Sequence, residues 1–362
     1  MMYNKIYIKH LYNIYLSRFA LITLIFSSLI FILNILEELK FFNNNESIGI
    51  GYPIILTILN LPSILFEIFP FIILITTQFF FIKFQSNNEI LIFKNNGINN
   101  LKIILNICFL VFLIGILIIS IFHFFSSTMK HNYLEFKNKY TKDNKYLAVV
   151  NENGLWIKDI FDENTMIIHA EKIEKNVLKD IVITIYDSEF RDQSNIVARE
   201  ALINNNTWEI KNLIKIDNSG IKKSFETYEL ETNFDYVKIN SLFSNLESLN
   251  IFELIQHKKD FQSVGLNIKD IDLHLHKLIS FPLSLVIFTV LSSILMFSIK
   301  FNKSKTFMLI LGIILSVIIY YIFYFFSLLG SNNQIPTIAA VWFPNLILFL
   351  CCMVGIVNIN EK

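Results

Sequence analysis

The chain contains few side chains whose type and spacing could support catalysis or metal binding. His274 and His276 stand two residues apart, and imidazole is a common ligand of zinc and copper. On a helix such a pair points to different faces, so we interpret it as an interfacial pair rather than a metal site. The sequence has no GxSxG or HExxH motif, and no glycine is followed by lysine, which excludes a Walker A phosphate loop. We therefore expect neither an enzyme nor a bound cofactor.

Two further ionisable residues lie within long apolar runs. Glu67 is the only charge in the run 54–82. An ionisable side chain inside a membrane span is costly and is usually functional, but a carboxylate near the outer interface also stays hydrated. Both interpretations of Glu67 remain open at this point. His123 lies in the run 103–129, where a packed and hydrogen-bonded histidine is favoured over a proton relay.

The composition indicates that both lipid and water have shaped the chain. Of its 362 residues, 54% are hydrophobic and only 17% are charged, against about 25% charged in soluble domains. Residues 126–276 hold 19 of the 31 Lys and Arg and 24 of the 30 Asp and Glu. The net charge of +1 and the interleaved acids argue against nucleic acid as a partner. All three cysteines lie in apolar runs, so neither a disulfide framework nor a zinc cluster is expected.

The apolar runs predict six membrane-spanning helices. They cover residues 19–36, 54–82, 103–129, 278–299, 307–329 and 337–357. The first run ends in Leu36-Glu37-Glu38 rather than in a small-residue cleavage site, so it is predicted to remain as a span. The last two runs are separated by the turn-forming residues 330–336. Six spans place both ends of the chain on one side.

Basic residues in the short loops predict which side that is. With both termini cytoplasmic, the inner segments carry ten Lys and Arg and the two short outer loops carry one, Lys40. The large polar block then lies on the outer face of the membrane. We expect three parts: residues 1–129 with spans one to three and a cytoplasmic segment 84–100, an outer β-domain over 130–270, and spans four to six over 271–362.

The polar block shows the pattern of an all-β domain. Short alternating or β-branched runs, separated by polar turn clusters, occur at residues 146–150, 155–158, 165–170, 181–186, 196–203, 207–213 and 225–231. Their spacing predicts an antiparallel sandwich or roll, followed by a short helix over 248–260. Trp156 and Ile185 are the candidates for its interior.

The inner loop 84–100 holds the most informative short segment. Ser86 or Asn87 can cap a helix whose Ile90 and Phe93 share a face, and Gly97 can end it. An apolar face on a short surface helix implies something that covers it. That cover is either a cytoplasmic partner, which makes the segment a docking site, or the chain's own spans.

Four stretches resemble the LptF/LptG permease family, the membrane subunits of the lipopolysaccharide exporter. They are the paired prolines of residues 61–71, the stretch N-E-I-L-I-F-K-N-N-G at 88–97, with Asn88 in place of the family's serine, G-L-W-I-K-D at 154–159 and I-P-T-I-A-A-V-W-F-P-N at 335–345. The resemblance extends over essentially the whole chain. The G-L-W-x-K-D stretch is closer to LptG than to LptF.

The resemblance implies a fold, a function and partners. The fold would be six transmembrane helices with an inserted periplasmic domain similar to a β-jellyroll. The chain would be a permease subunit that extracts lipopolysaccharide from the inner membrane towards the outer membrane. Its partners would be a cytoplasmic LptB-like ATPase, a second LptF-like permease, an LptC/LptA-like periplasmic bridge protein, lipopolysaccharide and membrane lipids.

The resemblance also implies roles for particular residues. Glu89, Ile90, Phe93 and Gly97 would couple the chain to the ATPase. Family members place basic residues near the outer end of span one, and here only Lys40 stands there. Lys40, Asn34 and Glu67 are the candidates for lipid contact.

Two other classes of function compete with this interpretation. The chain could be an envelope scaffold or sensor whose β-domain binds a protein while its spans only anchor it. An intramembrane enzyme would need a catalytic dyad or metal set, which the sequence does not offer. Extracting a lipid costs about 0.8 kcal/mol per exposed CH₂. Because the chain has no nucleotide loop, a transporter of this kind needs a separate ATPase.

Overall fold

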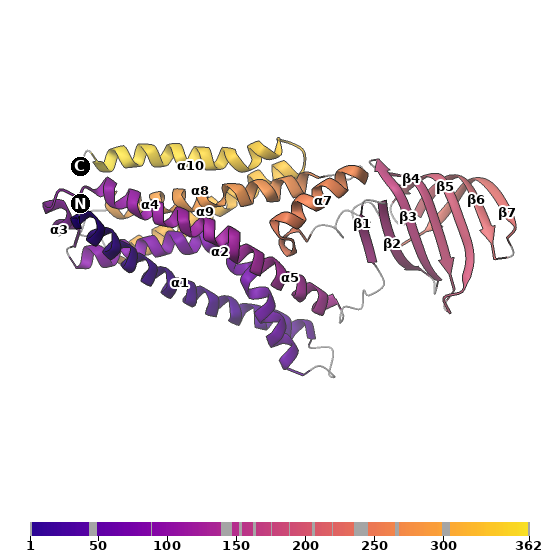
Figure 1. The fold of residues 1–362 in the computed structure, drawn as a ribbon, viewed down its shortest axis with the longest axis horizontal. Coiled ribbons are helices and arrows are strands. Elements are labelled where there is room, and N and C mark those ends of the chain that lie inside the picture. Colours follow the sequence, from indigo (N-terminus) through magenta and orange to yellow (C-terminus); the bar gives the residue numbers. More distant parts are fainter. Residues whose placement is uncertain are drawn as a thin grey trace. The chain divides into compact units, whose positions relative to one another are not determined.

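The chain forms a helical unit and a β-rich unit, shown in Figure 1. The helical unit comprises Met1–Tyr133 with Leu273–Lys362, and the β-rich unit comprises Leu134–Asp272. The computed structural model describes residues 2–42, 49–87, 89–138, 147–151, 154–161, 164–174, 176–187, 189–204, 207–218, 220–234, 245–264, 268–298 and 305–360.

Long apolar helices make up most of the helical unit. They are α1 (Met2–Phe42), α2 (Gly51–Ser86), α4 (Asn100–Leu117), α5 (His123–Asn138), α8 (Lys269–Ser298), α9 (Lys305–Ser331) and α10 (Thr337–Asn360). A five-residue π-helical stretch, η1 (Ile118–Phe122), joins α4 to α5 as one continuous helix. Within the described residues, six helices are therefore long and apolar enough to cross a membrane. This confirms the six predicted spans.

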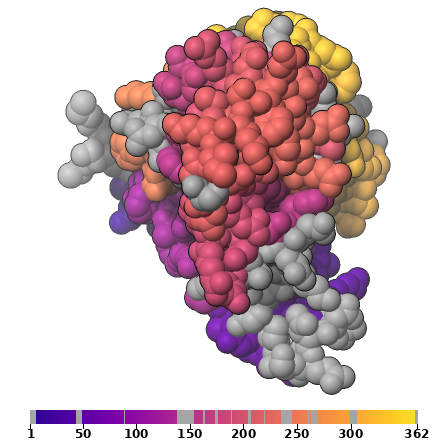
Figure 2. Space-filling view, turned by 90° about the vertical axis from the view of Figure 1, so that its right-hand side faces the viewer, coloured from indigo at the N-terminus to yellow at the C-terminus, as the bar shows by residue number. Residues whose placement is uncertain are grey.

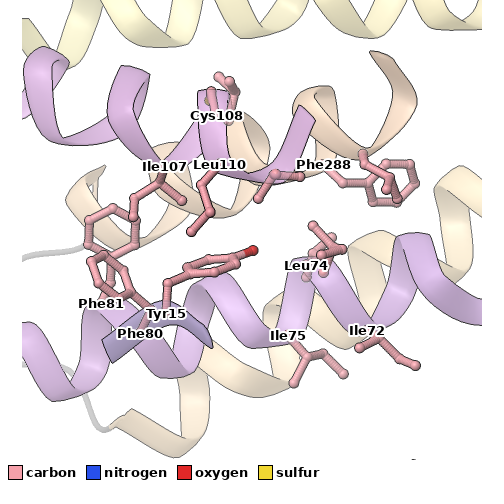
Figure 3. Packing of buried hydrophobic residues seen from close by; sticks show 14 of the residues in the cluster. Tyr15, Ile72, Leu74, Ile75, Phe80, Phe81, Ile107, Cys108, Leu110 and Phe288 are labelled. Carbon is pink, nitrogen blue, oxygen red and sulfur yellow. The ribbon is translucent and has the colours of Figure 1, made fainter. Parts of the chain in front are cut away.

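The core of the helical unit combines aromatic packing with hydrogen bonds between helices. Figure 3 shows the Tyr15 side chain among Phe80, Phe81 and Leu110. The Tyr15 hydroxyl lies 3.1 Å from Oγ1 of Thr77, and both residues are buried. Lipid tails are as apolar as these helices, so close packing and hydrogen bonds between helices, rather than burial from water, hold such a unit together.

Small residues allow the helices of this unit to approach closely. A Cβ atom added at Gly115 of α4 would lie 2.9 Å from the Pro282 Cα atom of α8. On α9, a Cβ atom at Gly312 would overlap the Gln78 side chain, whose Nε2 donates a hydrogen bond to the Met308 carbonyl at 3.0 Å. Glycine at membrane helix interfaces commonly serves this purpose. These contacts fix α8 against α4 and α9 against α2.

The β-rich unit is a single seven-stranded antiparallel sheet. Its strands are β1 (Leu147–Asn151), β2 (Gly154–Phe161), β3 (Asn164–Glu174), β4 (Val177–Tyr186), β5 (Asp192–Asn204), β6 (Thr207–Asp217) and β7 (Lys222–Glu231), and their order in the sheet follows the chain. A short 3₁₀ helix, η2 (Leu246–Ser248), and the helix α7 (Ile251–Val264) follow. The α7 helix contacts β1 and β3. The predicted all-β insertion and its return helix are thus present.

One edge of the sheet is exposed in the described part of the chain. The β7 side chains are almost all exposed. Figure 2 shows the salmon-coloured atoms of this end of the sheet uncovered by other described segments. Charged residues occur along β7, and charges on an edge strand discourage pairing with other chains.

The sheet is strongly curled, which makes it a roll rather than a sandwich. Asp159 of β2 accepts hydrogen bonds from the Thr232 hydroxyl at 2.7 Å and from the Asn233 backbone at 2.9 Å. The Trp208 indole of β6 donates to the Phe234 carbonyl at 2.8 Å. Three consecutive residues thus reach two strands that would be about 19 Å apart in a flat sheet. The curl of the sheet brings these strands near one another.

Alternation along the strands corrects one of the two predicted interior residues. Leu155 and Ile157 are buried, whereas Trp156 between them is 41% exposed and packs on His169, with ring centroids 4.2 Å apart. Successive strand residues face opposite sides of a sheet, so Trp156 belongs to the outer face. Ile185 pairs with the buried Met166 and so lies on the inner face.

Candidate functional site

The short helix α3 (Glu89–Asn95) forms within the predicted inner segment. Gly97 has φ of 77°, a left-handed conformation that favours glycine. The Gly97 amide donates to the Lys94 carbonyl and the Ile98 amide donates to the Phe93 carbonyl, both at 3.0 Å. These two bonds make a Schellman motif, which satisfies the last carbonyls of the helix. Gly97 therefore ends the α3 segment, as its position in the sequence predicts.

The face of α3 that carries Ile90 and Phe93 packs against the chain itself. Ile90 is buried, and the half-buried Phe93 ring contacts Phe84 of α2 at a centroid distance of 5.0 Å and Tyr7 of α1 at 5.9 Å. Of the two covers that the sequence left open for this face, the structure shows the chain's own helices. A helix of seven residues is unstable alone, so it must use its most apolar face to bind the bundle.

The apolar residues that α3 leaves exposed are Leu91 and Ile92. Each is 56% exposed. They lie on the opposite side of the helix from the Ile90–Phe93 contact, and Figure 1 places α3 at the end of the helical unit that carries both termini. These two aliphatic side chains are available for contact with another molecule.

The Glu89 carboxylate is held on both oxygens. Asn87 Nδ2 donates to Oε1 at 3.0 Å, and His10 Nε2 lies 2.9 Å from Oε2. His10 comes from α1, 79 positions away in the sequence. Sequence reasoning missed His10 because no local pattern links the start of the chain to the 84–100 loop.

A polar cluster lies towards the ends of α1 and α2 opposite to α3. Asn34 is buried, and its Oδ1 accepts a long hydrogen bond of 3.4 Å from Asn60. Lys130 of α5 donates to Asn60 Oδ1 at 2.8 Å. Asn34 thus packs within the chain beside the Asn60–Lys130 contact, and its role in lipid contact stays a prediction. Lys40, on the last turn of α1, is exposed.

Lys130 is a functional candidate that sequence reasoning did not select. Its only sequence signal was its place just after the third apolar run. Its Nζ lies 5.2 Å from the centre of the Tyr133 ring, and the Tyr133 hydroxyl donates to Glu38 at 2.8 Å. The cluster therefore joins α1, α2 and α5 through a lysine, an acid and amide groups at one level of the bundle.

Glu67 is exposed in the middle of α2. Between residues 59 and 85, all of which the structure describes, it is the only exposed side chain of this helix. Seven positions separate it from Asn60, which places it about 10 Å deeper along the helix. The helices α1 and α9 both pack against α2. They are also the spans that the rest of the chain covers least. In the most apolar stretch of each, 17% of the residues are buried, against 50% in α2.

The histidines form contacts within the helical unit. His123 is buried and packs on Phe66, with ring centroids 4.9 Å apart. The His123 and His274 rings lie 6.4 Å apart. In the described part of the chain, no group of three or more His, Cys, Asp or Glu residues could hold a metal ion.

The G-L-W-I-K-D stretch has a structural role at each end. Gly154 has φ of +118°, and a Cβ atom there would lie 2.3 Å from the Ala170 carbonyl oxygen. Asp159 is buried and bound to Thr232 and Asn233 as described above. These two residues therefore set the start of β2 and fasten the curled sheet.

A row of mostly apolar side chains crosses the outer face of the sheet. Trp156, His169, Val182, Val197 and Ile214 are cross-strand partners in adjacent strands from β2 to β6. The four residues other than His169 are 39–45% exposed. Such a row is available for contact with another molecule in the described part of the unit.

The chain matches one family over nearly its whole length. Residues 9–357 fit the family described as lipopolysaccharide export system permease LptF/LptG. The match runs from α1 to α10 and includes α3, the Asn34–Asn60–Lys130 cluster and the curled sheet. No curated protein matches the chain.

Proposed function

Because the chain belongs to the LptF/LptG family of lipopolysaccharide export permeases, we propose that it is one permease subunit of an ATP-driven exporter that moves lipopolysaccharide from the inner membrane towards the outer membrane. The family match over residues 9–357 is the observation that carries this proposal. The six apolar helices and the inserted β-roll agree with it, because a multi-pass membrane protein with a large polar lobe suits the removal of a lipid from a bilayer.

The energy for export comes from a separate subunit. Removing acyl chains from the bilayer costs about 0.8 kcal/mol per CH₂, and the sequence has no Walker A loop. The partner is a cytoplasmic LptB-like ATPase, and Leu91 and Ile92 of α3 are the apolar side chains available to it. Ile90, Phe93 and Gly97 then serve coupling indirectly, because they hold α3 in place.

The orientation follows from the basic residues. Ten Lys and Arg stand on the side of the termini and one, Lys40, stands in the short loops of the opposite side. The termini and α3 are thus cytoplasmic and the β-roll lies on the opposite side, which for an exporter of lipopolysaccharide is the periplasmic side of the inner membrane.

The other partners match the surfaces that the chain leaves open. The sparsely covered α1 and α9 face a second, LptF-like permease subunit and the lipid, and the β-roll hands lipopolysaccharide to an LptC/LptA-like bridge protein. The G-L-W-I-K-D stretch favours the LptG role for this chain.

Lipid contact involves three charged residues at different depths. Lys40 and Lys130 supply positive charge near the outer end of the bundle, where phosphate groups of the headgroup lie. Glu67 lies deeper along α2, on the exposed surface of this helix. A carboxylate facing hydrocarbon costs about 3 kcal/mol, so we assign this surface to a hydrated transport path rather than to bulk lipid.

Cysteine accessibility tests the position of Glu67. In a chain whose native cysteines are replaced, Glu67→Cys is expected to react with a membrane-impermeant maleimide at least about tenfold faster than Leu346→Cys. Maleimide reacts with the thiolate, which forms in water and not in hydrocarbon. Leu346 is an exposed apolar residue of α10 and serves as the matched control. Equally slow reaction at both positions would place Glu67 against lipid and contradict the assignment.

Depletion of the protein tests the export function itself. Lipopolysaccharide in the outer leaflet is expected to fall severalfold and to accumulate in the inner membrane, and the purified chain is expected to bring down an ATPase. The scaffold alternative has one observation in its favour, the exposed cross-strand row from Trp156 to Ile214. Normal outer-leaflet lipopolysaccharide after depletion would support that alternative and refute export.

A further inference from the structure

Two neighbouring contacts join the beginning of α1 to α3. His10 Nε2 lies 2.9 Å from the Glu89 Oε2 atom. The Tyr7 ring meets the Phe93 ring edge-on, at a centroid distance of 5.9 Å and an interplanar angle of 87°. Tyr7 and His10 are three positions apart on α1, and Glu89 and Phe93 are four apart on α3, so each pair occupies one helical face. The two faces meet as a two-point clamp, a name we use for these four residues.

The clamp is a substantial part of what holds α3. The helix has only seven residues, so its position depends on tertiary contacts rather than on its own stability. Apart from the clamp, the contacts described above come from α2 and from the loop residue Asn87, both next to α3 in the chain. The clamp links α3 to a span that is distant in sequence.

Glu89 and His10 differ in their access to water. The Glu89 side chain is 16% exposed, whereas the His10 side chain is 52% exposed. A partly buried carboxylate needs hydrogen-bond partners for both of its oxygens. Here Asn87 contacts one oxygen of Glu89 and His10 contacts the other. His10 therefore fixes the direction of the carboxylate.

The span that the clamp grips has much of its surface uncovered by the chain's own described helices. The helix α1 packs against α2 and α4, but only 17% of the residues in its most apolar stretch are buried within the chain, against 61% in α8. A displacement of α3 therefore acts on α1 directly at its inner end.

We propose that His10 is a positioning residue for Glu89, and that the clamp of Tyr7, His10, Glu89 and Phe93 carries motion of α3 into the first membrane span. This proposal rests on the proposed function, because it takes the ATPase subunit as the source of the motion. The proposed clamp gives this motion a route from α3 to α1 that does not pass through α2 or α4, the two helices next to α3 in the chain.

The test uses the purified complex in lipid nanodiscs, with three variants. His10→Ala removes the contact to Glu89, His10→Gln restores an N–H donor of similar reach, and His131→Ala is the matched control at an exposed histidine outside the clamp. The measured quantities are the ATPase bound per chain, ATP hydrolysis, and lipopolysaccharide released per ATP. His10→Ala is expected to keep ATPase binding within about twofold but to lower release per ATP at least threefold. His10→Gln is expected to recover half or more of the loss.

A second measurement reports the contact without any transport. Hydrogen exchange of the α3 amides is expected to be at least twofold faster in His10→Ala than in the wild type, because this short helix depends on its contacts with the bundle. Unchanged release per ATP in His10→Ala, or equal losses in His10→Ala and His10→Gln, overturns the clamp while leaving the exporter intact. Absence of any ATPase from the wild-type complex, with the difference in α3 exchange preserved, overturns the proposed function and with it this route of transmission.

Discussion

Replacing both Leu91 and Ile92 by aspartate is expected to weaken binding of the ATPase subunit at least about thirtyfold. Each side chain is 56% exposed, so covering the remaining apolar surface contributes roughly 1 kcal/mol per residue, and 1.4 kcal/mol corresponds to a factor of ten. Burying two new carboxylates adds a further penalty. The measurement is the affinity of the purified ATPase for the chain in detergent or nanodiscs.

The double substitution leaves the folded chain intact, because neither side chain belongs to the packed face of α3. Ile6→Asp is the matched control, since Ile6 is an exposed aliphatic residue of α1 at the same end of the helical unit. It is expected to change the affinity by less than about threefold. Wild-type affinity in the double variant would show that α3 is not the docking site. A substitution at Phe93 would be less informative, since loss of its ring contacts would also displace α3.

Gly154→Ala is expected to destabilise the β-roll by at least about 3 kcal/mol. A backbone conformation with positive φ costs a non-glycine residue about 1–3 kcal/mol. In addition, the new Cβ atom would lie 2.3 Å from the Ala170 carbonyl oxygen of the paired strand. The strand pair must separate to admit it, which disturbs β2 at its first residue. Hydrogen exchange of β2 and β3 amides in the full-length protein measures the loss.

Gly220→Ala provides the control for this prediction. Gly220 also has positive φ, of 78°, but no atom lies within 4 Å of a Cβ built there. This variant is expected to lose only about 1 kcal/mol, from backbone conformation alone. The difference between the two variants measures the close approach of β2 to β3. Equal losses would mean that the strands relax around the new methyl group, contrary to the rigid pairing described here.

The sequence by itself determined the number of spans, the inserted sheet and the end of α3. Membrane spans are visible because a charge-free stretch of about 20 residues has few other interpretations. The strands are visible because residue alternation and turn clusters are local. Gly97 ends α3 because a left-handed residue is needed where the helix stops, and glycine adopts that conformation without strain. In each case the evidence lies within one continuous stretch of chain.

Tertiary structure alone decided which face each element presents. Ile90 and Phe93 form an apolar face that suits a partner or the chain's own bundle equally well, and only their contacts with α1 and α2 show that the bundle takes it. The prediction for Trp156 was wrong because an alternating pattern shows that a strand has an inner face, but not whether its odd-numbered or its even-numbered residues occupy that face.

The polar contacts between helices were out of reach of sequence patterns for the same reason. His10 meets Glu89 across 79 positions, and Lys130 meets Asn60 across 70. Such pairs arise from the way helices pack, and the packing depends on many weak side-chain contacts that no single residue announces. Local chemistry therefore specified the elements and their order, whereas the assignment of Leu91, Ile92 and His10 to one site around α3 required the folded arrangement of α1, α2 and α3.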